Sequence, residues 1–460
     1  MALSITRTAN DVQDGTMTAQ SLVDAAFDSA EKYRDVNAFI SLNRDSAMAH
    51  ARRVDELVAH GDSAGRLAGV PLIIKDNIDV AGLRTTAGTP GIDYVATESS
   101  TVVSHLMSEG AIIIGKANMH ELAFGVTSNN TAFGAVRNPA DLTRIPGGSS
   151  GGTAAAVAAG IVSGGLGTDT AGSVRVPAAL TGVVGFRPTT WLVDQRGIVP
   201  SVPTFDVAGP MANTVEDVAL LYAVMTDRHM PVARQISGLR LGMPNSYMEN
   251  LSASVATAEQ GGLKRIERAG AALVAVDMSA ISAAAFEVGF PVGFHEMKSA
   301  MTTFLLHHKP GPSFENVVAR IASKDVKDTY LNAVLGNDAP TEDAYRNAIA
   351  RIDGIRSEYL KLLVEHRLDA LVFPTAPLEA PPIVGSDETV LLNGERVPTL
   401  PIFMRNVAAA GVYGAPGISL PLKGPDSNHL PVGLEIDGRP GEDHALLGIA
   451  LGVEAALLQV

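Results

Sequence analysis

The feature that most constrains the fold of this chain is a repeated step from a helix-like segment to a strand-like one. Apolar residues recur at helical spacing over 101–109, a glycine interrupts the pattern at 110, and a β-branched run follows at 111–116. The Ala-rich stretch 153–162 gives way to GLGTDT in the same manner, and the long helical pattern 342–366 precedes LDALVFPT. This alternation favours an α/β fold with a single large mixed β-sheet, largely parallel, covered on both faces by α-helices.

The domain organisation is expected to be simple. No Pro-rich linker, charge run or internal repeat divides the 460 residues, so we expect one main body over residues 1–460. The residue pattern changes over about 231–312, where a strand-like segment, a helix-like segment and AALVAVDM follow one another. This region is the candidate for a subdomain that sets substrate specificity.

Composition excludes several classes of protein. The formal net charge of -14 argues against general affinity for polyanions such as nucleic acid. The chain contains no cysteine, which excludes disulfides and thiolate nucleophiles. The N-terminus lacks the pattern of a secretory signal, and no stretch offers the about 20 uninterrupted apolar residues of a membrane span. We therefore expect a cytoplasmic protein with neither a membrane nor a nucleic-acid partner.

The segment richest in chemical information is GGSSGGTAAAVAAG at 147–160, continued by GLGTDTAGSVRVPAALTGVVGFRPT up to Thr189. Glycines beside Ser149 and Ser150, and Gly172 beside a further serine, allow a hydroxyl and several N–H groups to be held close to a substrate. A flexible turn before an Ala-rich helix is the plainer interpretation of the first fragment alone. A phosphate site is disfavoured, because neither a Walker lysine nor GxGxxG stands at the required place.

Three separated motifs together resemble the amidase signature family: VPLIIKDNID, GGSSGG and DTAGSVRVPA. The resemblance is strong over about 67–214, which would be the catalytic core, and looser elsewhere. It implies the amidase signature fold and a catalytic set of Lys75, Ser149 in a cis peptide, and the nucleophile Ser173. No His, Asp and Glu spacing indicates a metal site, and no cofactor is implied.

The implied set is chemically coherent. A serine hydroxyl attacks an amide only when something accepts its proton, and a lysine can do so if burial lowers its pKa. Lys75 follows three apolar residues, and Ser149 would relay the proton between Lys75 and Ser173. A Ser-His-Asp triad is the competing arrangement, with His120, His295 and the His307–His308 pair as its candidates. A lone histidine is more often a packed or surface residue, so we favour the lysine.

The backbone before the nucleophile is the expected oxyanion site. Thr170, Ala171 and Gly172 would supply N–H donors for the tetrahedral intermediate. Many relatives carry Gly-Gly before the nucleophile, whereas this chain has Ala171, whose methyl could constrain torsions or narrow the site. Asp169 and Arg175 flank the loop, and a structural ion pair is favoured over a catalytic role for them.

The segments 115–139 and 185–200 resemble the branch of the family that contains bacterial indoleacetamide and mandelamide hydrolases. By the family's pattern Ala123, Phe124 and Gly125 would face the acyl group, although Phe124 fits an ordinary core position equally well. An arylacetamide needs an apolar slot, for which the aromatic candidates are Trp191, Phe205, Phe294 and Phe304.

The expected activity is that of a serine amidase, with a small amide as partner. It would hydrolyse an aryl-substituted carboxamide to the carboxylate and ammonia through an acyl-enzyme on Ser173. A glutaminase subunit of a tRNA-dependent amidotransferase, and a hydrolase of biuret or carbamate-type amides, remain alternatives. The sequence leaves open whether the chain forms a homodimer.

Overall fold

The computed structural model describes residues 4–307, 311–422 and 430–458. Among these residues, eleven strands form one continuous sheet, and its ends are β1 and β12. In sheet order the strands are β1 (Phe39–Leu42), β5 (Ile112–Ala117), β2 (Pro71–Lys75), β8 (Gly164–Asp169), β10 (Val207–Ala212), β9 (Val184–Arg187), β16 (Gly417–Leu422), β17 (Val432–Asp437), β13 (Ala370–Pro374), β11 (Arg240–Pro244) and β12 (Ala272–Val276). Three two-stranded hairpins lie outside it: β3 (Arg84–Thr85) with β4 (Tyr94–Val95), β6 (Asn129–Asn130) with β7 (Gly134–Ala135), and β14 (Thr389–Leu392) with β15 (Glu395–Pro398).

The single mixed sheet expected from the sequence is confirmed, but its strands are less parallel than expected. Within the described residues, four neighbouring pairs are parallel: β2 with β5 and β8, and β11 with β12 and β13. The other six pairs are antiparallel, including all those around β10, β16 and β17. A buried apolar run looks the same in either direction, so the sequence carries no signal for strand polarity.

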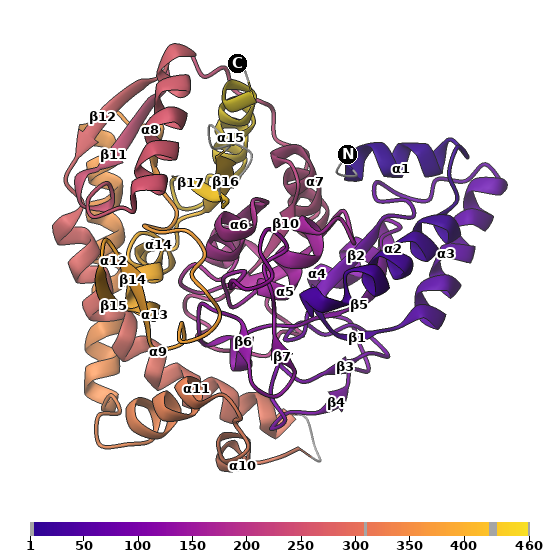
Figure 1. Cartoon of the computed structure of the whole chain (residues 1–460), viewed down its shortest axis with the longest axis horizontal. Coiled ribbons are helices and arrows are strands. Elements are labelled where there is room, and N and C mark those ends of the chain that lie inside the picture. The colour runs from indigo at the N-terminus through magenta and orange to yellow at the C-terminus, as the bar shows by residue number, and fades with distance from the viewer. Residues whose placement is uncertain (1–3, 308–310, 423–429, 459–460) are drawn as a thin grey trace.

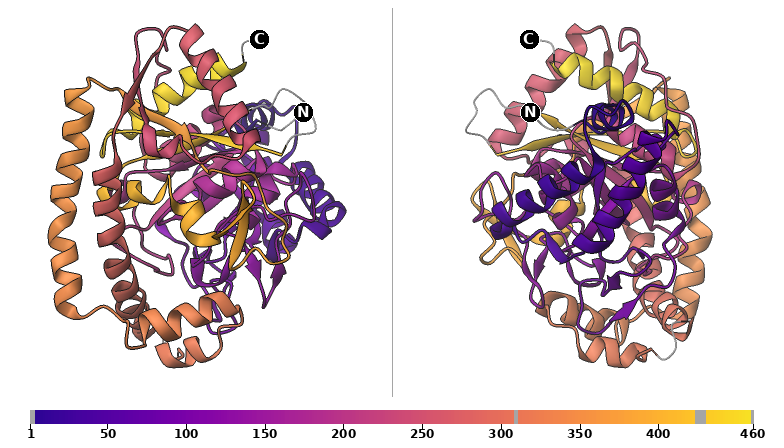
Figure 2. Two further views of the ribbon diagram at one scale, coloured as in Figure 1. Left: turned by 60° about the vertical axis from the view of Figure 1, so that its left-hand side comes forward. Right: turned by 90° about the vertical axis from the view of Figure 1, so that its right-hand side faces the viewer.

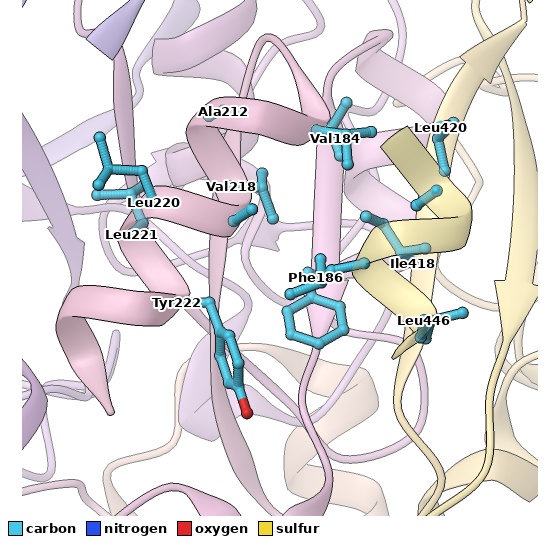
Figure 3. Packing of buried hydrophobic residues seen from close by; sticks show 14 of the residues in the cluster. Val184, Phe186, Ala212, Val218, Leu220, Leu221, Tyr222, Ile418, Leu420 and Leu446 are labelled. Atoms are coloured by element: carbon cyan, nitrogen blue, oxygen red, sulfur yellow. The ribbon is translucent and has the colours of Figure 1, made fainter. Parts of the chain in front are cut away.

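Both faces of the sheet are buried, as expected. Along β5, Ile113 belongs to one hydrophobic cluster while Ile112 and Ile114 belong to another, and β2 alternates likewise. Since successive side chains point to opposite faces, the two clusters are the two covers of the sheet. The first cluster is packed by α1 (Ile5–Gln13), α4 (Thr101–Ser108), α7 (Val215–Met225), α8 (Ala253–Arg268) and α15 (Asp443–Leu458). Figure 3 shows part of it, where Tyr222 of α7 lies beside Phe186 of β9, with ring centroids 5.2 Å apart.

The opposite face carries the remaining helices. α2 (Ala19–Lys32), α3 (Arg44–Ala59) and α5 (Gly151–Ala158) cover the N-terminal half of the sheet, and α6 (Arg175–Thr181) packs on β9, β16 and β17. At the other end lie α9 (Ser279–His307), α10 (Phe314–Ala319), α11 (Lys324–Thr329), α12 (Glu342–Glu365), α13 (Thr399–Met404) and α14 (Ala408–Tyr413). Figure 1 shows α1–α3 at one end of the molecule and the two long helices α9 and α12 at the other.

Local sequence explains where several helices begin. At Ser100, Thr214, Ser252 and Thr341 the side-chain oxygen accepts a hydrogen bond from the N–H three residues later, at the start of α4, α7, α8 and α12. The helices predicted over 101–109 and 342–366 are confirmed within a residue or two at their ends. The apolar run at 180–186, in contrast, is split between the end of α6 and β9.

The largest element that the sequence did not reveal is α9, a helix of 29 residues with Pro291 inside it. It begins within the region 231–312 and runs alongside α12, to which α10 and α11 connect it (Figure 2). In the sequence of α9, apolar residues, glycines and a proline are spread around the helix, so no amphipathic pattern predicts this helix. The division into a core at 67–214 and a subdomain at 231–312 stays a prediction. Among the described residues, none of the helices is long and apolar enough to cross a membrane.

Candidate active site

The predicted residues Lys75, Ser149 and Ser173 are brought to one edge of the sheet. Lys75 is the last residue of β2, and Ser173 follows the end of β8 by four residues. β2 and β8 are parallel neighbours, so their carboxyl ends meet at the same edge. Ser149 lies in the loop before α5, and the peptide bond between Gly148 and Ser149 is cis, as the resemblance implied.

Lys75 is fully buried and has three polar contacts. Its Nζ lies 2.7 Å from Ser149 Oγ, 2.8 Å from Thr168 Oγ1 and 3.4 Å from the Thr168 carbonyl oxygen. Desolvation lowers the pKa of Lys75 to about 7, although Asp169 and Asp206 act in the opposite direction. A neutral amine has two N–H groups and one lone pair. The two N–H groups can serve Thr168, which leaves the lone pair for the Ser149 hydroxyl.

The loop 170–173 is anchored by hydrogen bonds to the carboxylate of Asp169. This carboxylate accepts hydrogen bonds from the N–H groups of Gly172 at 2.9 Å and Val174 at 3.1 Å. Burial alone would raise the pKa of Asp169, but the Arg175 and Arg187 guanidinium groups hold it well below its usual range. The expected ion pair of Asp169 with Arg175 is confirmed, with Nε and Oδ2 3.0 Å apart. The loop therefore rests on a buried, permanently charged carboxylate.

The N–H groups of this loop are not equivalent. That of Gly172 is engaged by Asp169 and so is directed into the protein. Among the described residues, the N–H groups of Thr170, Ala171 and Ser173 have no hydrogen-bond partner. The sequence grouped Gly172 with Thr170 and Ala171, because spacing does not reveal which way a peptide group faces.

Ser149 and Ser173 are linked through their neighbours rather than directly. The Ser150 N–H donates to the Ser173 carbonyl oxygen at 3.1 Å. Within the described part of the chain, the two hydroxyls of Ser149 and Ser173 share no hydrogen bond. Ser149 is buried against Lys75, whereas Ser173 is half-buried and lies on the wall of a cavity.

Asp206 lies behind the same loop and ties it to the cavity wall. This buried carboxylate accepts from Thr170 Oγ1 at 2.6 Å and from the N–H groups of Ser201 and Val202, both at 2.8 Å. Burial raises the pKa of Asp206 and these three hydrogen bonds lower it, with burial the stronger influence. Sequence reasoning missed Asp206, since a lone aspartate after a phenylalanine carries no motif.

The cavity beside Ser173 has an empty volume of about 850 Å³, which includes its open mouth. The predicted residues Ala123, Phe124 and Gly125 line it together with Thr170 and Ala171. None of the described residues that line it is ionisable. The other lining residues are Val126, Ser173, Ser201, Val202, Phe205, Ala285, Phe286, Gly289, Phe290, Gly293, Phe294, Met297, Leu400, Met404, Ala408, Ala409 and Val412. The site thus combines a buried lysine, two serines and this apolar cavity, which we call the chamber.

Comparison with known proteins agrees with this arrangement. The protein-family profile described as Amidase matches residues 21–447. The chain belongs to the amidase family. The chain is 37% identical to a mandelamide hydrolase of Pseudomonas putida over 474 aligned residues, which cover 99% of this chain and 91% of that protein. It is 38% identical to an indoleacetamide hydrolase of Agrobacterium vitis, with 99% and 97% covered. A solved structure described as an amidase superimposes with a TM-score of 0.87 at 31% identity, covering 98% and 99% of the two chains.

In this amidase the side chains of the described candidate histidines interact with residues other than Ser149 and Ser173, although the His120 backbone N–H donates to the Ser149 carbonyl oxygen at 3.1 Å. His120 is buried, with Nε2 3.0 Å from Asp325 Oδ2 and Nδ1 accepting from the Ser128 N–H. His295 stacks on Tyr345. His307 lies on the exposed last turn of α9, and His308 lies outside the described residues.

Some of the aromatic candidates line the cavity, and the others lie elsewhere on the molecule. Phe205 and Phe294 line the amidase cavity, as does Phe124. Trp191 is 53% exposed with the Arg356 guanidinium over its ring, and Phe304 lines a separate hollow. Sequence reasoning missed Phe286 and Phe290, because α9 was not recognised as a helix. Among the described residues, no group of three or more His, Asp or Glu side chains is arranged to hold a metal ion.

Proposed function

We propose that this amidase hydrolyses a carboxamide with an apolar, aryl-substituted acyl group to the carboxylate and ammonia. One observation carries the proposal: within the described part of the chain, the chamber beside Ser173 is lined mainly by aromatic and aliphatic side chains and by no ionisable one. Such a chamber stabilises an apolar acyl group and has nothing to pair with a charged one. The relatives named for their action on mandelamide and indoleacetamide, both amides with aromatic rings, agree with this choice.

In the proposed mechanism the Ser173 hydroxyl attacks the amide carbonyl carbon. Its proton passes through the Ser149 hydroxyl to the lone pair of neutral Lys75, while a new bond forms from Ser173 Oγ to carbon. The oxyanion is stabilised by the free N–H groups of Thr170, Ala171 and Ser173. Ala171 keeps its N–H, so its methyl group removes no donor.

Collapse of the intermediate breaks the C–N bond. Lys75 returns the proton through Ser149 to the leaving nitrogen, which departs as ammonia and leaves an acyl-enzyme on Ser173. A water molecule then attacks the ester by the same proton route and releases the carboxylate. The relay requires a contact between the two serine hydroxyls that forms with substrate bound, since catalytic hydrogen bonds often tighten only in the complex.

The glutaminase alternative is less well supported. Glutamine carries an ammonium and a carboxylate close to the amide, and each needs a counter-charge when removed from water. The chamber supplies none. Biuret, which is small and entirely polar, would leave the aromatic walls without an apolar partner.

A panel of amides tests the proposal. Release of ammonia from phenylacetamide, mandelamide and indole-3-acetamide should give a kcat/KM at least 100-fold above that of glutamine or biuret, and Ser173→Ala should abolish it without unfolding the protein. A higher kcat/KM for glutamine or biuret would contradict the assignment. The cytoplasmic location stays a prediction from the sequence. Whether the chain forms a homodimer stays open.

A further inference from the structure

The helix α9 lines the chamber with two parallel strips of side chains. Residues four apart lie on one face of a helix, one above the other. One strip is aromatic, consisting of Phe286, Phe290 and Phe294. The ring centroids of Phe290 and Phe294 are 5.7 Å apart, and those of Phe286 and Phe290 are 6.4 Å apart. The neighbouring strip is small, consisting of Ala285, Gly289 and Gly293.

The two glycines of the small strip border open space. A Cβ placed on Gly289 would have one neighbour within 4 Å, a methyl of Val412 at 3.6 Å. A Cβ on Gly293 would likewise meet only a methyl of Val202, at 3.8 Å. Both valines line the chamber, so side chains at these two positions would project into the chamber itself. These are ordinary van der Waals distances, and an alanine fits at either position.

Close packing therefore does not account for these glycines. Gly262 on α8 is the contrasting case, because a Cβ there would come within 2.6 Å of Leu422. A glycine inside a helix is less favourable than alanine by about 1 kcal/mol. Among the described residues, no close tertiary contact at Gly289 or Gly293 offsets that local cost. The missing side chains instead leave room on the chamber wall.

We propose that Gly289 and Gly293 determine the largest acyl group that this amidase accepts. The inference rests on the proposed function and makes it more specific. The two open positions are one helical turn apart, which is about 5.4 Å of rise. Together they form a slot beside the rings of Phe290 and Phe294, which offer faces and edges to a flat aromatic group. The slot admits a fused two-ring acyl group such as indole, whereas an added side chain at either glycine leaves room for smaller groups only.

Graded substitutions test this assignment. The variants are Gly289→Ala, Gly293→Ala, Gly289→Leu and Gly293→Leu, and the substrates are indole-3-acetamide, phenylacetamide and isobutyramide. Gly354→Ala on α12 is the matched control, because Gly354 is exposed and a Cβ there meets nothing within 4 Å. Circular dichroism and thermal unfolding establish that each variant is folded.

The expected result is a change in selectivity. Each alanine should lower kcat/KM for indole-3-acetamide about tenfold, since one carbon in an apolar pocket changes the rate by about 10- to 200-fold. Each leucine should lower it more than about 200-fold, while isobutyramide changes by less than about threefold. Gly354→Ala should leave all three rates at the parent values.

The failures of the two proposals are distinguishable. A parent enzyme that hydrolyses none of the three amides would overturn the proposed function and this inference with it. A parent that hydrolyses phenylacetamide but not indole-3-acetamide would overturn the slot alone. So would variants in which the three amides lose rate in equal proportion, or in which indole-3-acetamide loses none.

Discussion

In the proposed mechanism, the pH dependence of catalysis follows from the burial of Lys75. Only the neutral amine can accept a proton, and desolvation lowers the pKa of Lys75 from 10.5 to about 7. At pH 7 the neutral fraction is therefore about one half, against roughly one in 3000 for an exposed lysine, a gain of roughly 1500-fold. We expect kcat/KM to rise about tenfold per pH unit below pH 7 and to level off above it.

The same group makes a matching prediction for stability. The unfolded chain holds the lysine proton up to pH 10.5 and the folded protein releases it near pH 7, so unfolding becomes more costly as the pH rises between these values. Below pH 7 the full penalty is up to about 5 kcal/mol. Lys75→Met removes this penalty and the two short hydrogen bonds, each worth about 1 kcal/mol. The variant should be inactive and about 3 kcal/mol more stable than the parent at pH 7.

The assay is ammonia release from phenylacetamide between pH 5 and 9, with urea unfolding of the same samples. Lys116→Met is the matched control, because Lys116 is equally buried on the neighbouring strand but its Nζ faces Thr85 Oγ1 and Asp76. In Lys116→Met, kcat/KM should fall below pH 7 in the same way as in the parent. An acid limb centred above pH 9, or a Lys75→Met variant that retains the parent profile, would refute the reasoning.

Two further predictions concern buried carboxylates. Asp206 raises the pKa of Lys75 and accepts a hydrogen bond from Thr170. Asp206→Asn should therefore shift the fall of kcat/KM on the acid side to lower pH, and should reduce the maximal kcat/KM about tenfold. An unshifted pH profile would show that Asp206 does not act on the lysine. Glu259 on α8 is fully buried and has no hydrogen-bond partner among the described residues, and burial raises its pKa to about 8. The folded protein keeps this proton between about pH 4.5 and 8 while the unfolded chain loses it, so stability falls across that window. Glu259→Gln should thus be more stable than the parent by up to about 5 kcal/mol at pH 8 and no more stable at pH 4; equal differences at both pH values would contradict this.

Sequence reasoning anticipated the positions of the nominated residues on the strands better than it anticipated the architecture around them. The motifs place Lys75 at the end of a strand and Ser173 just after another, and the parallel pairing of β2 with β8 brings them together. That pairing was consistent with the helix–strand alternation, but the antiparallel insertions of β10 and of β16 with β17 were not visible. Strand order is a property of contacts distant in the chain, and apolar runs do not encode it.

The wall of the chamber was the part least accessible to sequence reasoning. Phe286 and Phe290 belong to a helix whose glycines and proline obscure its periodicity, so their approach to Ser173 depends on how α9 packs against α14. The direction of the Gly172 N–H was equally hidden, since it depends on the position of Asp169 beneath the loop. The family motifs were sufficient to nominate the candidate reacting groups, and only packing could place the residues that surround them.

The central claim is that Ser173 is the nucleophile, and covalent labelling tests it most directly. The parent enzyme is treated with an aryl fluorophosphonate, digested, and mapped by tandem mass spectrometry. The account predicts one phosphonylated residue, Ser173, with no labelling in Ser173→Ala and slower labelling at the same residue in Ser149→Ala. A label on Ser149 in the parent enzyme, or undiminished labelling of Ser173→Ala, would contradict it.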